Sequence, residues 1–591
     1  MVQKNLQIHT ENILPIIKKW LYSDKDIFIR ELVCNACDAL LKLKLLHTNN
    51  TIEPRIDIHI DTANKTLTFT DTGIGMTADE VEKYIAQIAF SGAEEFMNKY
   101  TNSSEKDHII GHFGLGFYSA YMVSSKVDLE TLSYQENATA ALWSCDGSTT
   151  YTLTESSRTQ IGTSITLHLD AESHEYIDPA KIRSILQKYC AYLPFPIYLE
   201  GARINDKDPL WLKSPNDCTE NDYLEFYRSL YPMDPDPLFW IHLNVDYPFT
   251  LQGILYFPKI HRRFDWNQNN IKLFCNRVFV SDSCKEIIPD YLMCLKGALD
   301  SPNIPLNVSR STLQMDRTVR QLSTHISKKI TDRLSQLYDT EKETFYTIWP
   351  DVELTVKLGI LQDDKFYDRA RPFLIWKTLS GTWTTLEGKT DKIFYIQDEK
   401  VNTPLLDLYT QKGIDILLAT HPVDTPLLNY LEDKLRPATF QRIDGAIDPA
   451  LLDTSREKTL LDPEGKTEAG RIADYIRSCL QIPVEAKSLA SDTLPAFLVV
   501  DEDMRRMRDS LQLSGQSLPL GDKRTFVVNT NSPLISSLYA LKDKNPTLAE
   551  KAIQHLYDLS LLGQKELSPQ DLPSFLTRAH TLLSETLGLN K

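Results

Sequence analysis

The stretch "IFIRELVCNACDALLKLKLL", residues 27–46, contains neither glycine nor proline and repeats its apolar residues with helical spacing. At roughly 100° per residue, Glu31, Asn35 and Asp38 fall on one narrow face of the predicted helix. The opposite face is expected to be buried, and it carries Leu32, Val33, Ala36 and Leu40. Two carboxylates and an amide in a stripe suit a bound ligand, although on an isolated helix a solvated surface is the commoner explanation.

A strand hairpin with a glycine-rich end follows this helix. Residues 56–77, "IDIHIDTANKTLTFTDTGIGMT", alternate apolar and polar residues on both sides of "TANK", which predicts two strands joined by a turn. The second strand ends at Asp71, and Gly73 and Gly75 come directly after it. A carboxylate in this position can accept hydrogen bonds from a base, and the glycines allow the backbone to approach a ligand closely.

Three more glycines precede an apolar helical stretch in "GHFGLGFYSAYMV", residues 111–123. Glycines that open a helix suit a phosphate, because their amides are free to point inward and a helix N-terminus favours negative charge. Each of these patterns is common by itself, so the specific signal is their order. A helical E-x-x-x-N-x-x-D is followed by D-x-G-x-G, then by G-x-x-G-x-G, and finally by Gly162-Thr163.

This ordered set resembles the Bergerat-type (GHKL) ATP-binding domain shared by gyrase B, the ninety-kilodalton heat-shock proteins, sensor histidine kinases and the MutL mismatch-repair proteins. Within that group, the sequence of residues 21–40, 71–77 and 111–123 is similar to the sequences of the heat-shock chaperones, and the similarity continues through most of the chain. The resemblance implies a multidomain α/β (α+β) protein. Its expected parts are an ATP-binding α/β sandwich with a lid (1–205), an α/β middle domain (206–462) and a mixed α/β C-terminal dimerisation domain (463–591).

The resemblance also implies a role for each matching residue of the first domain. Glu31 would be the general base that orients the attacking water, and Asn35 would ligate a Mg²⁺ that bridges the phosphates of ATP. Asp71 would bind the adenine amino group, supported by Thr163. The other expected nucleotide contacts are Asp38, Gly75, Met76, Gly114, Gly116 and Phe117. These roles are chemically coherent, because Mg²⁺ takes few protein oxygens beside phosphate and water, and phosphoryl transfer needs mainly positioning and charge neutralisation.

A second signature, "DSPNIPLNVSRSTLQMD" at residues 300–316, lies in the expected middle domain. Arg310 matches the family's arginine that reaches the γ-phosphate, and Gln314 matches its helper, so both are expected to be catalytic. Without the resemblance, a surface arginine paired with a local carboxylate would be the preferred reading of Arg310. Ser311 stands where the family has a glutamate, which could alter the local orientation.

Some residues depart from the family pattern. Phe90 stands in place of a lysine, Tyr84 in place of an asparagine and His112 in place of a glutamine. The first two family residues lie near the nucleotide, so these departures put nucleotide affinity and the chemistry of the lid (about 92–116) in question. The core catalytic set is intact, which argues against a dead ATPase.

Cys34 and Cys37 flank Asn35 in a Cys-x-x-Cys pattern. A zinc site would need two more ligands, and the chain has no second Cys-x-x-Cys. The family usually has small residues at both positions. The pair is therefore predicted to pack within the helix rather than to act as a redox or metal site.

The length, charge and cysteine content of the whole chain exclude several classes of function. Its 591 residues suggest about three or four domains. A net charge of −16 argues against a nucleic-acid partner, and no apolar run approaches the roughly 18 residues that membrane insertion requires. Nine irregularly spaced cysteines do not form a disulfide framework, so a reducing cytoplasm is expected.

Together these features predict a cytoplasmic, homodimeric, Mg²⁺-dependent ATPase that remodels partly folded client proteins as a molecular chaperone, with co-chaperones as possible further partners. The absence of a charged linker and of an acidic tail points to the bacterial branch of the family. Met504, Met507, Phe264 and Trp266 are candidate client contacts, with ordinary burial as the alternative. Two rival functions remain open: a DNA-acting relative of MutL and a scaffold that binds ATP without hydrolysing it. A histidine kinase is disfavoured, because no phosphoacceptor helix precedes the ATP domain.

Overall fold

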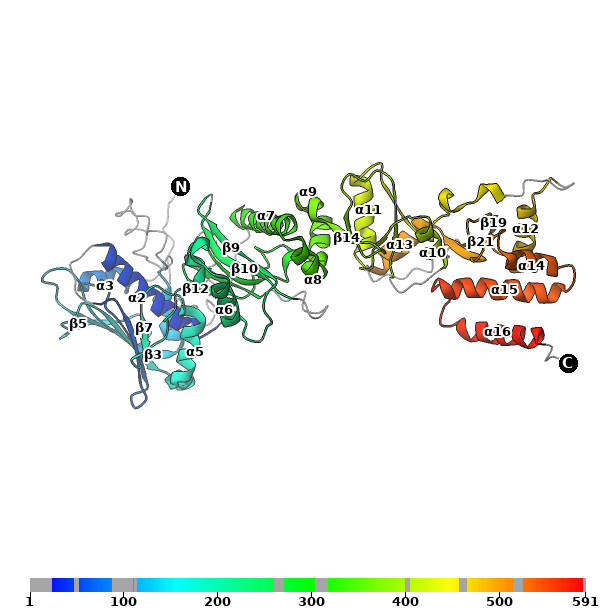
Figure 1. The fold of residues 1–591 in the computed structure, drawn as a ribbon. Helices are drawn as coiled ribbons and strands as arrows, with labels where there is room; N and C mark the ends of the chain where they lie inside the picture. The colour runs from blue at the N-terminus through cyan, green and yellow to red at the C-terminus, as the bar shows by residue number, and fades with distance from the viewer. Residues whose placement is uncertain are drawn as a thin grey trace, which may run out of the picture. The chain divides into compact units, whose positions relative to one another are not determined.

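The helix predicted from the opening stretch is present as α2 (Ile27–Leu45). This computed structural model describes residues 24–46, 53–87, 110, 114–247, 249–259, 270–302, 304, 317–398, 404–456, 465–513 and 524–587. The chain divides into two compact units, Met1–Ile330 and Thr331–Lys591 (Figure 1), and each is described by itself. In the described part of the chain, no helix is both long and apolar enough to span a membrane.

An eight-stranded sheet dominates the first half of unit 1. Its strands are β1 (Ile56–Asp61), β2 (Thr66–Asp71), β3 (Ser124–Leu132), β4 (Ala141–Cys145), β5 (Thr152–Glu155), β6 (Gly162–Leu169), β7 (Ile197–Leu199) and β8 (Ala202–Arg203). They are ordered β5-β4-β3-β6-β2-β1-β7-β8, and every neighbouring pair is antiparallel except the parallel β1–β7 pair. The helices described in this half include α2, α3 (Ala78–Tyr84), α5 (Pro179–Cys190) and the 3₁₀ helices η4 (Gly116–Met122) and η5 (Ala171–Ile177), and α2 lies along the sheet (Figure 1).

The predicted hairpin is confirmed, and its ends show why the chain turns there. β1 pairs with β2 in the register Ile56 to Asp71, and the carboxylate of Asp61 accepts the backbone N–H groups of Ala63 and Asn64 in the turn. After the glycines that follow β2, Thr77 caps α3. Its hydroxyl accepts from the N–H of Glu80, whose carboxylate accepts the N–H of Thr77 in return.

The second half of unit 1 contains α6 (Glu220–Leu230) and a five-stranded sheet. The sheet is ordered β12-β11-β13-β10-β9, with β9 (Phe239–Val245), β10 (Leu251–Phe257), β11 (Asn270–Cys275), β12 (Val278–Ser281) and β13 (Lys296–Asp300). One hydrophobic core runs from α2 through both sheets to β13. The expected boundary after residue 205 therefore falls inside a continuous core, and it stays a prediction.

Unit 2 alternates helices with small sheets. Its helices are α7 (Arg317–Thr340, which contains the division between the units), α8 (Lys342–Gln362), α9 (Asp364–Ala370), α10 (Pro404–Gln411), α11 (Asp424–Lys434), α12 (Glu468–Leu480), α13 (Glu502–Leu513), α14 (Pro533–Leu541), α15 (Pro546–Gly563) and α16 (Leu572–Thr586). Its strands are β14 (Ile375–Lys377), β15 (Trp383–Thr385), β16 (Lys392–Ile396), β17 (Ile416–Leu418), β18 (Thr439–Arg442), β19 (Val484–Lys487), β20 (Ala496–Val500) and β21 (Arg524–Asn529).

These strands form the sheets β14-β15, β17-β16-β18 and β19-β21-β20. One hydrophobic cluster joins residues 394–451 to residues 489–527, and a second joins α12 to α15. The expected boundary after residue 462 also stays a prediction. The α/β character predicted for all parts of the chain is present in both units.

Candidate nucleotide site

The polar face of α2 is not a solvated surface. Glu31 is 5% exposed and Asp38 is 7% exposed, whereas Asn35 between them is only partly buried. Burying two carboxylates is costly unless each has a partner, so their surroundings decide what this face can do. The predicted apolar face is buried as expected, at Leu32, Val33, Ala36 and Leu40.

Glu31 is held between an arginine and a glycine. The Nη2 and Nε atoms of Arg30 donate to its Oε1 at 2.7 and 3.0 Å, and both side chains are buried. Its other oxygen, Oε2, lies 2.6 Å from the position that a Cβ atom on Gly116 would occupy, so a side chain at residue 116 would displace this carboxylate. The carboxylate thus faces the start of η4, where the sequence predicted phosphate binding. Sequence reasoning missed Arg30.

Asp38 ties α2 to the segment that precedes the glycine-rich stretch. Its Oδ1 accepts the backbone N–H of Ile110 at 2.8 Å, and Ile110 is itself buried. The expected nucleotide contact of Asp38 stays a prediction, and the structure gives this carboxylate a role within the protein as well.

Asp71 occupies the end of β2 and is fully enclosed. Burial raises the pKa of its carboxyl to about 7, although the N–H groups of Gly73 and Thr163 donate to it and Arg158 is near. The Gly73 N–H lies 2.8 Å from Oδ1. Burial therefore dominates over these stabilising contacts, and the carboxyl exchanges its proton near neutral pH.

The backbone after Asp71 requires a glycine at position 75. Gly75 has φ +62°, and a Cβ atom there would lie 1.9 Å from the carbonyl oxygen of Leu132. The N–H of the next residue, Met76, donates to Thr131 Oγ1 at 2.9 Å, and that hydroxyl lies 3.0 Å from Thr163 Oγ1. Thr131 thus joins Met76 to Thr163, and no local pattern in the sequence indicates this contact.

The glycine-rich stretch opens a 3₁₀ helix rather than an ordinary α-helix. Gly114 has φ +63°, and η4 begins at Gly116. The side chain of Phe117 is buried in the core against Trp143, with ring centroids 5.7 Å apart. A phosphate contact by Phe117 would therefore involve its backbone.

Two clusters of predicted site residues therefore lie along α2. Near the start of the helix, the Glu31 carboxylate contacts Gly116. Nearer its end, Ala39 contacts the loop that follows Asp71. The carbonyl oxygen of Ala39 accepts the N–H of Ile74 at 3.1 Å. The structure brings most of the predicted residues of the first domain into these two clusters.

Comparison with known protein families identifies the family to which the chain belongs. Residues 24–175 match the family model "Histidine kinase-, DNA gyrase B-, and HSP90-like ATPase", and residues 199–591 match the model "Hsp90 protein". The chain belongs to the heat-shock protein 90 (HSP90) family. The GHKL-type ATPase domain and the multidomain architecture expected from the sequence are confirmed.

Relatives of the same family cover most of the chain. "Chaperone protein HtpG" of Porphyromonas gingivalis strain W83 is 42% identical over 588 residues, which cover 92% of this chain and 85% of that protein. "Chaperone protein htpG" of Bacteroides fragilis strain YCH46 is 39% identical over 594 residues, covering 94% and 87%. "Chaperone protein HtpG" of Geobacter sulfurreducens is 30% identical over 621 residues, covering 95% of each. The expected bacterial HSP90 branch is confirmed, and the protein is an ATP-dependent molecular chaperone.

The cysteines of this HSP90 chain are compatible with packing roles. All nine are free thiols, and Cys34 and Cys37 are buried. Burial, with the neighbouring Cys34 and Cys190, raises the pKa of the Cys37 thiol well above its ordinary value, which disfavours the reactive thiolate. Within the described ranges, no group of three or more His, Cys, Asp or Glu side chains could hold a metal ion.

Several predicted HSP90 residues lie outside the described residues: Arg310, Gln314, Ser311, Phe90 and His112, with most of the expected lid. Tyr84 is the last residue of α3, and the Nζ of Lys83 lies 5.1 Å from its ring centroid. The catalytic and nucleotide-binding roles of all the named residues stay predictions.

Proposed function

We propose that this chaperone is a Mg²⁺-dependent ATPase that hydrolyses ATP to ADP and phosphate and remodels partly folded clients through an open and closed cycle of a homodimer. The observation that carries the ATPase part is the buried Glu31, which faces Gly116 and is paired with Arg30. A buried carboxylate held in place by a partner can orient a water molecule beside a phosphate. Cytoplasmic action and co-chaperones belong to the same proposal, and the nine free thiols suit a reducing compartment.

The residues present fit Mg²⁺ bound together with a nucleotide. Asn35 offers an amide oxygen on the partly exposed part of the α2 face, one turn from Glu31. Mg²⁺ takes most of its ligands from phosphates and water, so one protein oxygen can suffice beside a bound nucleotide. When bound, Mg²⁺ would neutralise charge on the phosphates.

The remaining chemistry belongs to the protein's own groups. Glu31 would orient the attacking water and accept its proton, and Arg30 would hold that carboxylate in place. At the other cluster, the Asp71 carboxylate would accept a hydrogen bond from the adenine amino group. Thr163 lies opposite Asp71 in the strand pair β2–β6 and would help to hold that carboxylate in place. The glycines at 75, 114 and 116 would let the backbone approach the base and the phosphates.

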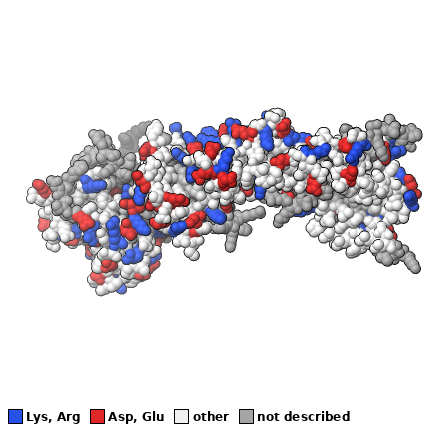
Figure 2. Space-filling view, in the orientation of Figure 1, with Lys and Arg blue, Asp and Glu red and all other residues white. Residues whose placement is uncertain are grey.

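An HSP90 match over residues 199–591 decides against a DNA-acting MutL relative. On the face shown in Figure 2, basic and acidic side chains are interspersed, whereas phosphate binding favours a single-sign basic patch. The scaffold that binds ATP without hydrolysis remains the second candidate, because Tyr84 and Phe90 depart from the family pattern.

The C-terminal helix pair supports the homodimer. α16 packs beside α15 through a buried Phe575, stacked on His555, and through an Arg578–Asp558 ion pair. Its outer side carries an apolar stripe, and the surface of this pair in Figure 2 is mostly uncharged. The stripe consists of Leu572, Leu576, Leu583 and Leu587, all exposed and within about 60° of one another at 100° per residue. A second copy of the chain would cover this stripe by symmetry.

The double substitution Leu576→Glu and Leu583→Glu should weaken dimerisation on the order of 100-fold, because two charges would be buried at the centre of the interface. Light scattering of the full chain would then report a monomer. Thr581→Glu, an exposed change on another side of α16, should leave the dimer intact. A dimer unaffected by the double substitution would place the interface elsewhere.

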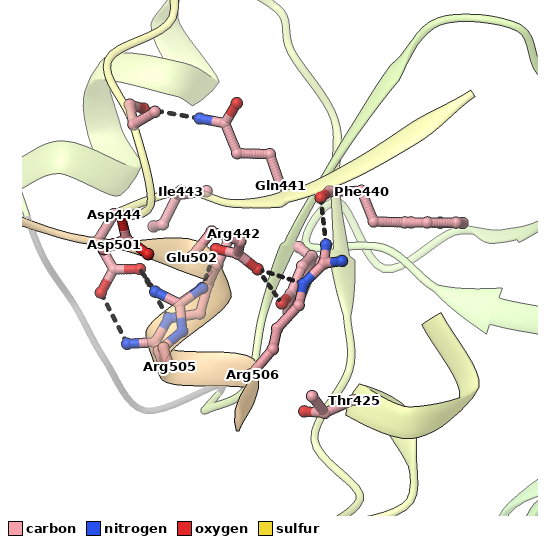
Figure 3. Close-up of polar contacts among 12 residues, drawn as sticks. Thr425, Phe440, Gln441, Arg442, Ile443, Asp444, Asp501, Glu502, Arg505 and Arg506 are labelled. Atoms are coloured by element: carbon pink, nitrogen blue, oxygen red, sulfur yellow. Dashed lines mark hydrogen bonds and ion pairs between the residues drawn. The ribbon is translucent and has the colours of Figure 1, made fainter. Parts of the chain in front are cut away.

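Client contact is proposed for Met507 on α13, which is 51% exposed. Arg506 on α13 bonds to Glu432 at 2.6 Å. Figure 3 shows how the helix is held further: Arg506 bonds to Glu502 at 2.9 Å, and the fully buried Arg505 bonds to Glu502 and Asp444. A helix held in this way presents its methionine in a constant orientation, and methionine adapts to varied apolar partners. Phe264 and Trp266 lie outside the described residues.

Arg310→Ala should lower ATP turnover at saturating ATP by at least about 10-fold, because a guanidinium on the γ-phosphate stabilises transition-state charge. The affinity for ATP should change by less than about threefold, since the contact strengthens only in the transition state. Turnover assays and calorimetry on the full chain measure the two quantities. Unchanged turnover would make Arg310 an ordinary surface arginine.

A further inference from the structure

Three polar side chains stand in a row across the first sheet, on the neighbouring strands β2, β6 and β3. Asp71 lies opposite Thr163 in the β2–β6 pair, and Thr163 lies opposite Thr131 in the β3–β6 pair. Residues that face each other across antiparallel strands point to the same side of a sheet, so the three side chains share one face. All are buried: Asp71 and Thr163 are each 6% exposed, and Thr131 is 0% exposed.

The hydroxyl of Thr131 has three neighbours at hydrogen-bond distance. Its Oγ1 lies 2.9 Å from Met76 N, 3.2 Å from the carbonyl oxygen of Gly162 and 3.0 Å from Thr163 Oγ1. A hydroxyl has one proton to donate and two lone pairs that accept. The Met76 N–H can only donate, so it takes one lone pair, and the Gly162 carbonyl can only accept, so it takes the proton. One lone pair of Thr131 remains for Thr163.

These contacts set the direction of the hydrogen bond between the two threonines. All three contacts of Thr131 are satisfied together only when Thr163 donates its proton to Thr131. The Thr163 hydroxyl then has no proton left and can only accept a further hydrogen bond. In the described part of the chain, Thr131 is the one partner of that hydroxyl, so a lone pair on it is open to a ligand.

Asp71 is the second acceptor in this row. Its carboxylate accepts the N–H of Gly73 at 2.8 Å and the N–H of Thr163, and in the ionised form it has no proton to donate. The neighbouring Asp71 and Thr163 side chains therefore present acceptors only. An amino group can donate to such a pair, whereas a carbonyl oxygen in the same place would face lone pairs without a donor.

We propose that Thr131 is a positioning residue for base specificity, which makes the nucleotide site select a purine with an amino group at C6 over one with a carbonyl oxygen there. It does so by keeping the Thr163 hydroxyl an acceptor, and it touches no nucleotide itself. Loss of the Thr131 hydroxyl would free the Thr163 proton, which could then be donated to a carbonyl oxygen of the base. This inference rests on the proposed binding of adenine at Asp71 and Thr163.

The test measures the affinities of ADP and inosine diphosphate for the full chain by calorimetry. The two bases differ in the group at C6, and neither nucleotide has a γ-phosphate, so the result does not depend on turnover. Burial raises the pKa of Asp71 to about 7, so the measurement is made at pH 8, where most of this carboxyl is ionised.

Thr131→Val keeps the shape of the side chain and removes its hydroxyl. The ratio of the affinity for ADP to that for inosine diphosphate should fall at least about fivefold. Thr131→Ser keeps the hydroxyl, and its ratio should stay within about twofold of wild type. An equal loss of affinity for both nucleotides in Thr131→Val would mean that the residue only supports the backbone at Met76, and it would overturn the inference.

Thr70→Val is the matched control on the same strands. The Thr70 hydroxyl bonds to that of Ser164 at 2.9 Å, and these residues adjoin Asp71 and Thr163, so their side chains lie on the opposite face of the sheet. This variant should leave the ratio of affinities within about twofold of wild type. A fall as large as in Thr131→Val would assign the effect to the strand pair and contradict the role of Thr131.

A double-mutant cycle tests whether Thr131 acts through Thr163. Thr163→Val should lower the ratio as well, because the acceptor is lost, and adding Thr131→Val should change it no further. A further fall of the same size in the Thr163→Val background would contradict this path.

Asp71→Asn separates this inference from the proposed function. If this variant binds ADP as tightly as wild type does, the adenine position assigned to Asp71 is wrong, and the inference fails with it. Weaker binding of ADP to Asp71→Asn, together with an unchanged ratio in Thr131→Val, would overturn the role of Thr131 alone.

Discussion

Replacing Glu31 by alanine is expected to lower ATP turnover by at least about 100-fold while leaving the affinity for ATP within about threefold. A positioned general base contributes roughly 10²–10⁴ to rate, and the pocket for the nucleotide is built mainly by other residues. Alanine would also remove the carboxylate with which the buried Arg30 is paired, which should lower the folding free energy. Single-turnover hydrolysis, calorimetry and thermal melting together separate these effects.

Glu31→Gln is the companion variant, because it keeps the shape and an acceptor for Arg30 while removing the basic oxygen. It should lose turnover as fully as the alanine variant with a smaller loss of stability. Glu136→Ala, an exposed carboxylate of the same unit, should behave as wild type. Turnover at the protein-free background level in wild type and both Glu31 variants would favour the scaffold that binds ATP without hydrolysis, whereas equal turnover above background would contradict the role given to Glu31.

Asp71→Asn is expected to weaken ATP binding at least about 100-fold, because the adenine amino group would lose a buried charged acceptor and face an NH₂ group instead. The same change should stabilise the empty protein at pH 8. The folded-state pKa of about 7 lies above the ordinary 3.8, so folding is favoured by the protonated form. That stability is fully present below about pH 4 and is lost as pH rises to about 7.

The free energy of unfolding that is lost as Asp71 ionises is on the order of 4 kcal/mol, because the pKa difference is about three units and each unit corresponds to 1.36 kcal/mol. Wild type should therefore melt at progressively lower temperature between pH 4 and 7, relative to Asp71→Asn. Asp57→Asn, on the neighbouring strand β1, provides the matched control and should retain ATP affinity. Parallel pH dependences of wild type and Asp71→Asn, or full ATP affinity in the variant, would contradict the role given to Asp71.

Local patterns predicted α2 and the β1–β2 hairpin, because both follow from periodicity over a few residues. The positive φ of Gly75 and Gly114 agrees with the expectation that glycines there shape the backbone. Whether the polar face of α2 was buried could not be predicted in this way, because the residues that enclose Glu31 come from η4, some 85 positions later.

The two contacts that sequence reasoning missed have different causes. Arg30 and Glu31 are adjacent, and neighbours at i and i+1 on a helix do not ordinarily face each other, so spacing rules direct attention to i+3 and i+4. Their long side chains nevertheless converge inside the protein. Thr131 meets Met76 and Thr163 only because β3 pairs with β6, a register that no local pattern specifies.

A carboxyl group with a pKa near 7 at the expected adenine position makes protons and ATP competitors for the same oxygen atoms. If the adenine amino group binds the ionised form, each binding event near neutral pH releases a fraction of a proton, and each fall in pH opposes binding by the same free energy. Acidification would then lower the occupancy of the site by ATP.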